Sequence, residues 1–143
     1  MLKGIHPLLN ADLLYVLAAM GHGDEIAIVD RNYPAASTAR RLVRLDGVGV
    51  IEAADVILSV LPVDTFTETP VLRMEVVGAP SDLPAVQKAF LAACEASEQR
   101  QITMGSLPRD QFYARAREAF SIVATTEPRP YGCFLLTKGV IND

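Results

Sequence analysis

The stretch from Met20 to Asp30, MGHGDEIAIVD, marks a sharp change of local structure. Glycines flank His22, and the apolar run that follows ends at Asp30. A short, continuous apolar run is typical of a strand buried on both faces of an α/β sheet. Before it, Asn10 is placed to cap a helix with apolar residues three and four positions apart, and Gly21 suits the left-handed end of that helix. The sequence here predicts a helix, a glycine-rich turn and a buried strand in succession.

Helical and strand-like patterns alternate through the rest of the chain. The pattern predicts further helices at 34–45, 51–61, 83–96 and 108–119, and further strands at 70–77, 102–104, 121–125 and 133–140. We expect Ser81 to cap the helix at 83–96 and Pro108 to open the helix that follows. Such alternation is typical of an α/β fold in which helices cover a mostly parallel sheet. Residues 1–143 are expected to form a single domain.

The composition limits the classes of partner. Half of the 143 residues are hydrophobic, which is high for a small soluble domain, and we expect some of this surplus to cover a subunit interface. The net charge is -4 and the basic residues are scattered, so no nucleic-acid partner is expected. No apolar run reaches the length of a membrane span, so no membrane association is expected. Two distant cysteines, Cys94 and Cys133, favour a reducing, cytoplasmic location without a structural disulfide.

His22 and Asp30 are the first candidates for chemistry. In open α/β sheets, ligands bind beyond the carboxyl ends of strands, where we expect Asp30 to lie. His22 follows the first helix, whose carboxyl end favours a protonated imidazole, and nearby carboxylates have the same effect. A protonated histidine at that position is suited to donate a proton. The alternative is an exposed histidine at a helix cap, with no function.

Two cofactor interpretations are disfavoured. Gly21 and Gly23 resemble the start of a dinucleotide-binding loop, but Ile26 occupies the third glycine position, and the segment precedes a strand instead of following one. A metal site made of His22, Asp24 and Asp30 lacks a second histidine at helical spacing. The residue pattern therefore favours neither a dinucleotide nor a metal ion at this turn. Asp24 has two open roles, either in solvating the turn or in orienting His22.

Several segments together resemble the fucose mutarotase and ribose pyranase family. They are MLKGIHPLL at the start, MGHGDEIAIVD, NYPA at 32–35, FYARAREAF at 112–120 and YGCFLLTKGVI at 131–141. The resemblance covers essentially the whole chain, and MGHGD and YPA follow the fucose mutarotase branch. It implies a three-layer α/β/α fold with a mixed, mostly parallel sheet. It also implies a ring-shaped homo-oligomer, typically a decamer, with sugar sites between neighbouring subunits and no cofactor.

The implied activity is the interconversion of the α and β anomers of a reducing monosaccharide, with L-fucose the first choice. The ring oxygen gains a proton while the anomeric hydroxyl loses one, so an acid and a base suffice. By resemblance, His22 is the proton donor. The residues that the resemblance assigns to sugar binding are Asp30, Arg109, Tyr131, Gly132 and Cys133. The family has asparagine at the position of Cys133, and a thiol is a weaker partner for sugar hydroxyls than an amide is.

Two alternatives remain open from the sequence. One is a D-ribose pyranase, which interconverts pyranose and furanose rings, and the other is a sugar-binding module without catalysis. For a site shared between subunits, the sequence suggests that one chain supplies His22 and Asp30 and its neighbour supplies Tyr131.

Overall fold

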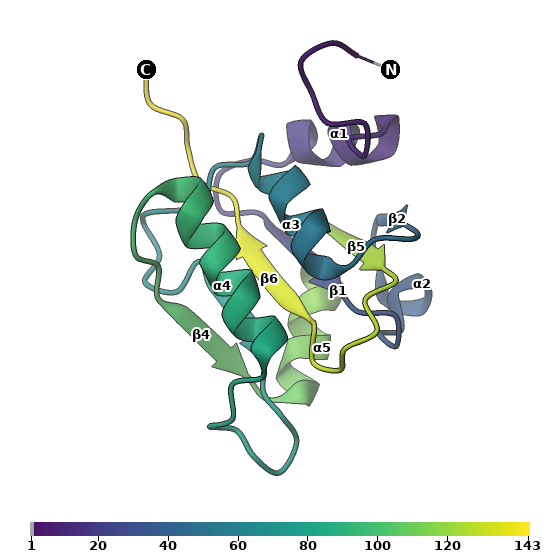
Figure 1. Cartoon of the computed structure of the whole chain (residues 1–143), viewed down its shortest axis with the longest axis vertical. Coiled ribbons are helices and arrows are strands. Elements are labelled where there is room, and N and C mark those ends of the chain that lie inside the picture. The colour runs from purple at the N-terminus through teal and green to yellow at the C-terminus, as the bar shows by residue number, and fades with distance from the viewer. Residues whose placement is uncertain (1) are drawn as a thin grey trace.

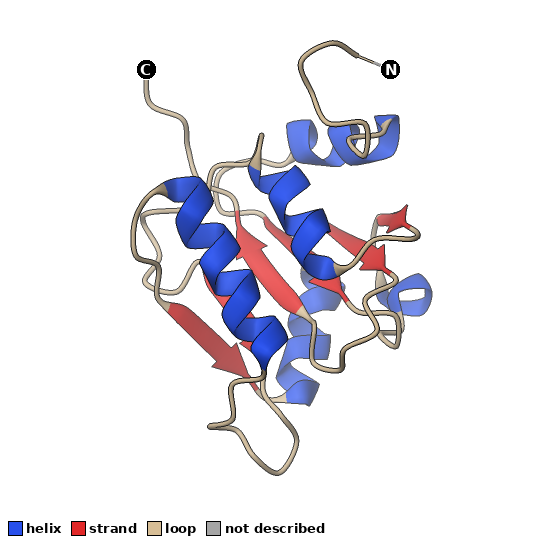
Figure 2. Ribbon diagram, viewed as in Figure 1, coloured by secondary structure: helices blue, strands red, loops and turns tan. Residues whose placement is uncertain are grey.

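A computed structural model describes residues 2–143. Its helices and strands alternate along the chain (Figures 1 and 2). The helices are α1 (Ala11–Ala19), α2 (Ala35–Thr38), α3 (Val50–Leu58), α4 (Ala85–Glu98) and α5 (Arg109–Glu118). The strands are β1 (Glu25–Val29), β2 (Leu42–Leu45), β3 (Val71–Met74), β4 (Met104–Leu107), β5 (Ser121–Thr125) and β6 (Phe134–Thr137).

The six strands form one mixed sheet in the order β2-β5-β1-β6-β3-β4. The pairs β1·β5, β2·β5 and β3·β4 are parallel, whereas β6 runs antiparallel to both β1 and β3. The predicted α/β class and mostly parallel sheet are confirmed. The sequence EIAIV occupies a central strand, where Ile28 lies beside Val123 of β5 and Phe134 of β6.

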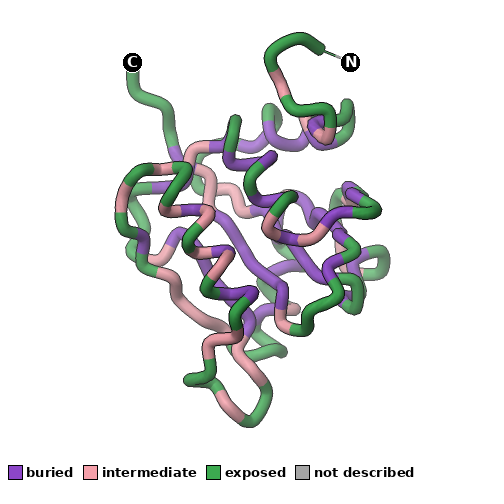
Figure 3. The backbone as a smooth tube through the Cα atoms, in the orientation of Figure 1, coloured by how far each residue is buried: buried purple, intermediate pink, exposed green. Residues whose placement is uncertain are grey.

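Helices cover both faces of the sheet (Figure 1). Along β1, Ile26 and Ile28 face a core shared with α1, α3 and α4, while Ala27 and Val29 face a second core with α5. Because successive strand residues point to opposite faces, the continuous apolar run fills both cores. Figure 3 shows the resulting arrangement, with buried segments running through the middle and exposed chain at both termini.

Side chains stabilise both ends of α1, the helix that precedes His22. As predicted, the Asn10 side chain caps α1 by accepting from the Leu13 backbone N–H. At the other end, the Lys138 ammonium donates to the carbonyls of Leu17 and Met20 at 2.8 and 2.6 Å. A lysine from the far end of the sequence therefore neutralises the carboxyl end of α1.

The prediction of a left-handed Gly21 was wrong. Met20 ends α1 in an extended conformation, and the glycine with a positive φ of 87° is Gly23. The Gly21 backbone N–H instead donates to the Asp24 carboxylate at 2.7 Å.

The prediction of one helix over 34–45 was also wrong. Only α2 is helical there, and β2 follows it as an edge strand beside β5. Alanine, arginine and leucine all favour helices, but this segment hydrogen-bonds to β5 through Arg41, whose carbonyl accepts from the Ile122 backbone N–H. Sheet pairing therefore overrides the local helical preference.

Two smaller boundary predictions were corrected. Ser81 does not cap α4, because the helix begins at Ala85 with Pro84 at its N-cap. The residue before a proline is disfavoured in the helical region, which keeps Leu83 outside the helix. The strand expected at 102–104 is β4, displaced to Met104–Leu107 by its pairing with β3. Within residues 2–143, no helix combines the length and apolar character needed to cross a membrane.

Candidate active site

A hollow of 210 Å³ lies at the carboxyl ends of β1 and β3. It is lined by Asp30, Asn32, Tyr33, Met74, Arg109, Tyr113, Pro130, Tyr131 and Cys133. Four of the residues that the sequence assigned to sugar binding thus line one hollow, and the fifth, Gly132, lies between two of them. A larger hollow of 470 Å³ adjoins it through Arg109 and is lined otherwise by 75–78, Pro80, Pro108 and Asp110.

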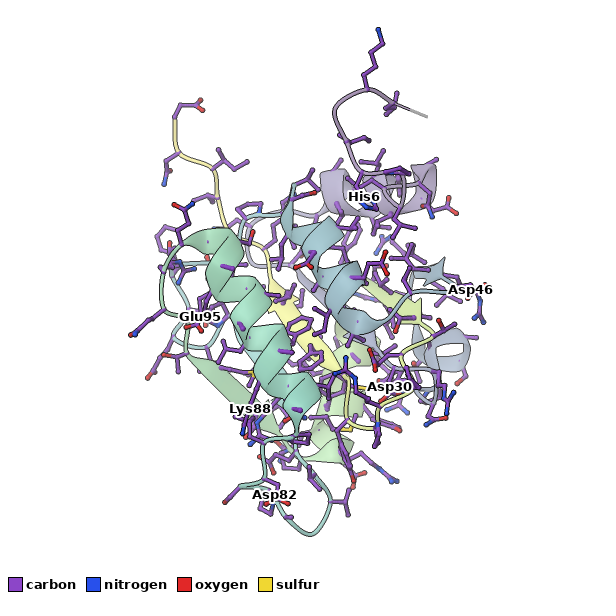
Figure 4. All side chains as sticks on the ribbon, viewed as in Figure 1. His6, Asp30, Asp46, Asp82, Lys88 and Glu95 are labelled. Carbon is purple, nitrogen blue, oxygen red and sulfur yellow. The ribbon has the colours of Figure 1, made fainter. Side chains whose placement is uncertain are left out.

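Asp30 is a buried carboxylate at the end of β1, away from α1 (Figure 4). Its Oδ1 accepts from the Asn32 backbone N–H at 3.0 Å. Its Oδ2 accepts from the Gly132 N–H at 3.2 Å and from the Cys133 thiol at 3.4 Å. These contacts fix the carboxylate against the turn that precedes β6, and the remaining lone pairs can accept from a ligand hydroxyl.

The turn that carries Tyr131 is tightly built. Tyr131 has a φ of 62°, a left-handed conformation that is uncommon for any residue other than glycine. A Cβ on Gly132 would lie 3.1 Å from the Glu127 Cγ and 3.5 Å from the Asp30 Cβ, so only glycine fits without displacing its neighbours. Strained backbone of this kind persists where surrounding contacts hold it, and it often marks functional sites.

Glu127 connects the same turn to the start of α3. Its buried carboxylate pairs with Arg129, at 2.7 Å between Nε and Oε1, and accepts from the Val50 backbone N–H at 3.1 Å. Val50 begins α3, whose N-cap Gly49 has no side chain to offer, so Glu127 supplies the cap. The hydrogen bond from Arg129 holds the pKa of Glu127 below its ordinary value, against the opposing effect of burial.

Cys133 is buried against Asp30. Burial, together with the negative charge of Asp30, raises the pKa of the Cys133 thiol well above its ordinary value. The thiol therefore stays neutral and serves as a weak hydrogen-bond donor to Asp30.

Arg109 and Tyr33 complete this part of the site. Arg109 is the exposed first residue of α5, where the helix dipole disfavours a cation, and its guanidinium lies over the Tyr113 ring at 5.7 Å from the centroid. Tyr33 packs edge-to-face on Tyr113, with ring centroids 4.9 Å apart. The Tyr33 hydroxyl is enclosed and has no hydrogen-bond partner among residues 2–143. Burial raises the pKa of Tyr33 to about 12.

His22 has a different set of neighbours. Its Nε2 lies 2.9 Å from Oδ1 of the buried Asp64, and its ring contacts that of Phe66 at a centroid distance of 4.9 Å. Burial alone would raise the pKa of Asp64, but hydrogen bonds from the Thr67 N–H and the His22 ring hold it below its ordinary value. An ionised carboxylate only accepts, so Nε2 carries the hydrogen. Asp64, and not Asp24, therefore orients the imidazole.

Within one chain, His22 and Asp30 do not meet. They lie at opposite ends of the five-residue strand β1, which spans roughly 16 Å at the usual rise per residue. The suggested grouping of His22 with Asp30, opposite a neighbour's Tyr131, was therefore wrong: Asp30 and Tyr131 line the same hollow of one chain. The separation also rules out a metal site made of His22, Asp24 and Asp30. Among residues 2–143, no cluster of three or more histidine, cysteine or acidic side chains is arranged to hold a metal ion.

Sequence patterns did not identify Asp64 or Glu127. Asp64 stands alone in LPVDTF, between predicted elements, so nothing in its spacing linked it to His22. Glu127 lies in the proline-containing segment EPRP between two predicted strands, and its burial depends on α3, which is distant in sequence.

The fold agrees with comparisons to known proteins. A family model described as the RbsD / FucU transport protein family matches residues 3–141. The fucose mutarotase of Homo sapiens is 40% identical over 98% of this chain and 94% of its own length. The crystal structure of the Streptococcus pneumoniae fucose mutarotase in complex with L-fucose superposes with a TM-score of 0.91, at 39% identity over 99% of this chain and 100% of that one.

A more distant structure shares the fold. Bacillus subtilis RbsD, solved with D-ribose, has a TM-score of 0.74 at 23% identity over 99% of this chain and 100% of that one. The family match spans nearly the whole sequence, and its relatives are similar along their full length. The chain therefore belongs to the RbsD / FucU transport protein family.

Proposed function

We propose that this chain is a sugar mutarotase that interconverts the α and β anomers of L-fucose or a closely related reducing sugar, without metal or cofactor. The observation that carries the proposal is the full-length similarity to a fucose mutarotase solved with L-fucose. The hollow around Asp30 supports it, because a fixed carboxylate, an arginine and a tyrosine are suitable partners for sugar hydroxyls. In this proposal the whole chain works as one mutarotase domain.

His22 is the proposed proton donor to the ring oxygen. Asp64 holds Nε2 and leaves Nδ1 without a hydrogen-bond partner among the described residues. The ring is 43% exposed, so Nδ1 is available to a substrate. Asp30, Arg109, Tyr131, Gly132 and Cys133 are proposed to bind the sugar.

We further propose that the site is shared between subunits of a homo-oligomer, with a decameric ring as the specific expectation. His22 and Asp30 are too far apart to act on one monosaccharide within a chain. Exposed hydrophobic side chains flank both places: Phe66, 73% exposed, contacts His22, and Val77, 62% exposed, lies beside Tyr131, whose hydroxyl accepts from the Val77 N–H. A neighbour that covers these side chains brings its His22 to the hollow of the first chain.

A cytoplasmic location is part of the proposal. Both cysteines are free and buried, which suits a reducing compartment.

Saturation-transfer NMR of anomer exchange tests the activity. Saturation of one L-fucose anomer signal should reach the other when the protein is present. In a sample without protein, spontaneous exchange should be too slow to transfer it. D-Ribose in the same assay, with pyranose and furanose signals followed separately, tests the pyranase alternative. Faster ring-form exchange of ribose than anomer exchange of fucose would favour the pyranase. Binding of L-fucose without acceleration would favour a non-catalytic sugar-binding module and contradict the proposal.

A further inference from the structure

A polar pair lies buried between α4 and the sheet, behind the proposed sugar site. Gln87 of α4 is fully buried, and Arg73 of β3 is 8% exposed. Arginine is rarely buried without an acidic partner, yet no carboxylate of residues 2–143 forms a salt bridge with Arg73. A buried cation that forgoes ion pairing must be satisfied by neutral acceptors.

Arg73 finds those acceptors in three places. Its Nη1 donates to Oε1 of Gln87 at 3.2 Å and to the Asp82 carbonyl at 3.2 Å, and its Nη2 donates to the Pro80 carbonyl at 2.9 Å. The guanidinium thus joins Gln87 to the loop between β3 and α4. This loop lies at the bottom of the view in Figure 4, where Asp82 is labelled.

Gln87 also hydrogen-bonds to two segments of the proposed sugar site. Its Nε2 donates to the Met74 carbonyl at 2.7 Å and to the Tyr131 carbonyl at 3.1 Å. Met74 ends β3, and Tyr131 belongs to the turn before β6. One side-chain amide therefore uses both of its hydrogens to connect two segments that line the hollow.

The orientation of this amide is dictated by its partners. Arginine only donates, so the Gln87 oxygen must face Arg73, and its nitrogen must then face the two carbonyls. Without Arg73 the buried amide oxygen would lose its donor, and the amide would be held through its nitrogen alone. The pair therefore acts as one unit, in which Arg73 aligns Gln87 and Gln87 holds Tyr131.

The backbone conformation of Tyr131 depends on restraint by its neighbours. Its φ of 62° is costly for a side chain with a Cβ, and such a conformation persists only when its surroundings impose it. Gln87 restrains its carbonyl, while the Val77 N–H restrains its hydroxyl at 3.1 Å. Val77 belongs to the same loop whose carbonyls Arg73 anchors.

We propose that Gln87 is a positioning residue for sugar binding, with Arg73 as the group that fixes its amide. The inference rests on the proposed function, because it takes Tyr131 as a sugar contact. Gln87 touches no substrate; it acts by keeping Tyr131 aimed into the hollow that Asp30 and Arg109 also line.

The test compares Gln87→Met, Arg73→Met and the double variant, with Val86→Ala as the matched control. Val86 is the buried neighbour of Gln87 on α4 and makes no hydrogen bond to Tyr131 through its side chain. We expect Gln87→Met to raise KM and the Kd for L-fucose about tenfold, roughly the effect of one hydrogen bond, with kcat little changed. Arg73→Met should act in the same direction, and the double variant should bind no more weakly than Gln87→Met alone.

A second measurement does not depend on sugar. The chain has four tyrosines, so fluorotyrosine labelling gives four ¹⁹F NMR signals, and Tyr131→Phe identifies the one from Tyr131. Gln87→Met and Arg73→Met should shift this signal, whereas Val86→Ala should leave it in place. If the wild-type protein binds no fucose, the proposed function fails and the ¹⁹F shift alone decides the positioning role.

Two results would overturn the inference. One is an unchanged Tyr131 signal in Gln87→Met with wild-type affinity for L-fucose. The other is an equal loss of affinity in Val86→Ala, which would assign the effect to general destabilisation of α4. Should Gln87→Met fail to fold, Arg73→Met carries the same test with Gln87 in place, and an unchanged Tyr131 signal there contradicts the proposal.

Discussion

The His22 ring is oriented by Asp64, a residue 42 positions away in the sequence. The carboxylate fixes which ring nitrogen is engaged and leaves the other exposed. Replacing His22 by alanine should lower the rate of anomer exchange at least about 100-fold, the usual contribution of a general acid. The variant should remain folded, because the ring is 43% exposed and contacts mainly Asp64 and Phe66. Saturation-transfer NMR measures the rate, and circular dichroism checks the fold.

The other histidine provides the matched control. His6 lies beside α1 in the N-terminal segment (Figure 4), and its Nδ1 accepts from the Leu8 backbone N–H. His6→Ala should keep the wild-type rate. Equal activity in the His22 and His6 variants would remove His22 from the mechanism.

The two thiols should be inert in the native protein. Burial raises the pKa of Cys94 to about 12, and it raises the pKa of Cys133 well above the ordinary value. Because only the thiolate attacks, we expect both to react with a disulfide reagent at least about 100-fold more slowly than free cysteine. Absorbance after adding the reagent, with and without guanidinium, measures this, and Cys94→Ala isolates Cys133. Rapid labelling of native Cys133 would show that the thiol is open to solvent.

Among the structural elements, the turn from Glu127 to Gly132 both caps α3 and positions Tyr131. Glu127 caps α3 and pairs with Arg129, so it holds the segment that presents Tyr131. Glu127→Gln should lower the free energy of unfolding by about 1 to 3 kcal/mol, because a buried charged hydrogen-bond partner is lost. Arg129→Gln leaves the α3 cap in place and should lower the free energy of unfolding by less. Guanidinium denaturation at one fixed protein concentration compares the variants.

The same carboxylate predicts a pH dependence. The pKa of Glu127 is lowered in the folded chain, as is that of Asp64. Each therefore stabilises the fold above its unfolded pKa, about 4 for these side chains, and this stabilisation is lost as pH falls through the folded pKa. The difference in the free energy of unfolding between wild type and Glu127→Gln should be largest at pH 7 and should decrease below about pH 4. A gap that stays constant to pH 3 would contradict the assignment.

The sequence predicted elements well where one periodicity dominated. EIAIV identified the central strand because both of its faces are buried, and Asn10 identified the start of α1 because capping is local. The segment 34–45 failed because its residues favour a helix, whereas its pairing with β5 depends on contacts about 80 positions away. Resemblance to a family located Asp30, Arg109 and Tyr131, but local pattern could not find Asp64, Gln87 or Glu127, whose partners come together only on folding.

Across the molecule, the residues proposed to act on the sugar lie at opposite ends of β1. Asp30 and Tyr131 line the hollow, and His22 lies at the far end of β1. We expect each complete site to take His22 from one subunit and both Asp30 and Tyr131 from its neighbour. Inactive variants His22→Ala and Tyr131→Ala, unfolded together and reassembled, should then recover activity, because some interfaces pair an intact His22 with an intact Tyr131.

A second mixture makes the test specific to this division. Asp30→Asn and Tyr131→Ala should not rescue each other, because every hollow then carries one defect whichever neighbour supplies His22. Native mass spectrometry confirms that mixed oligomers form and gives the number of subunits. Recovery in the first mixture and none in the second is expected. Recovery in the second mixture would show that Asp30 and Tyr131 act in different sites. No recovery in the first, with mixed oligomers present, would mean that His22 acts within its own chain or not at all.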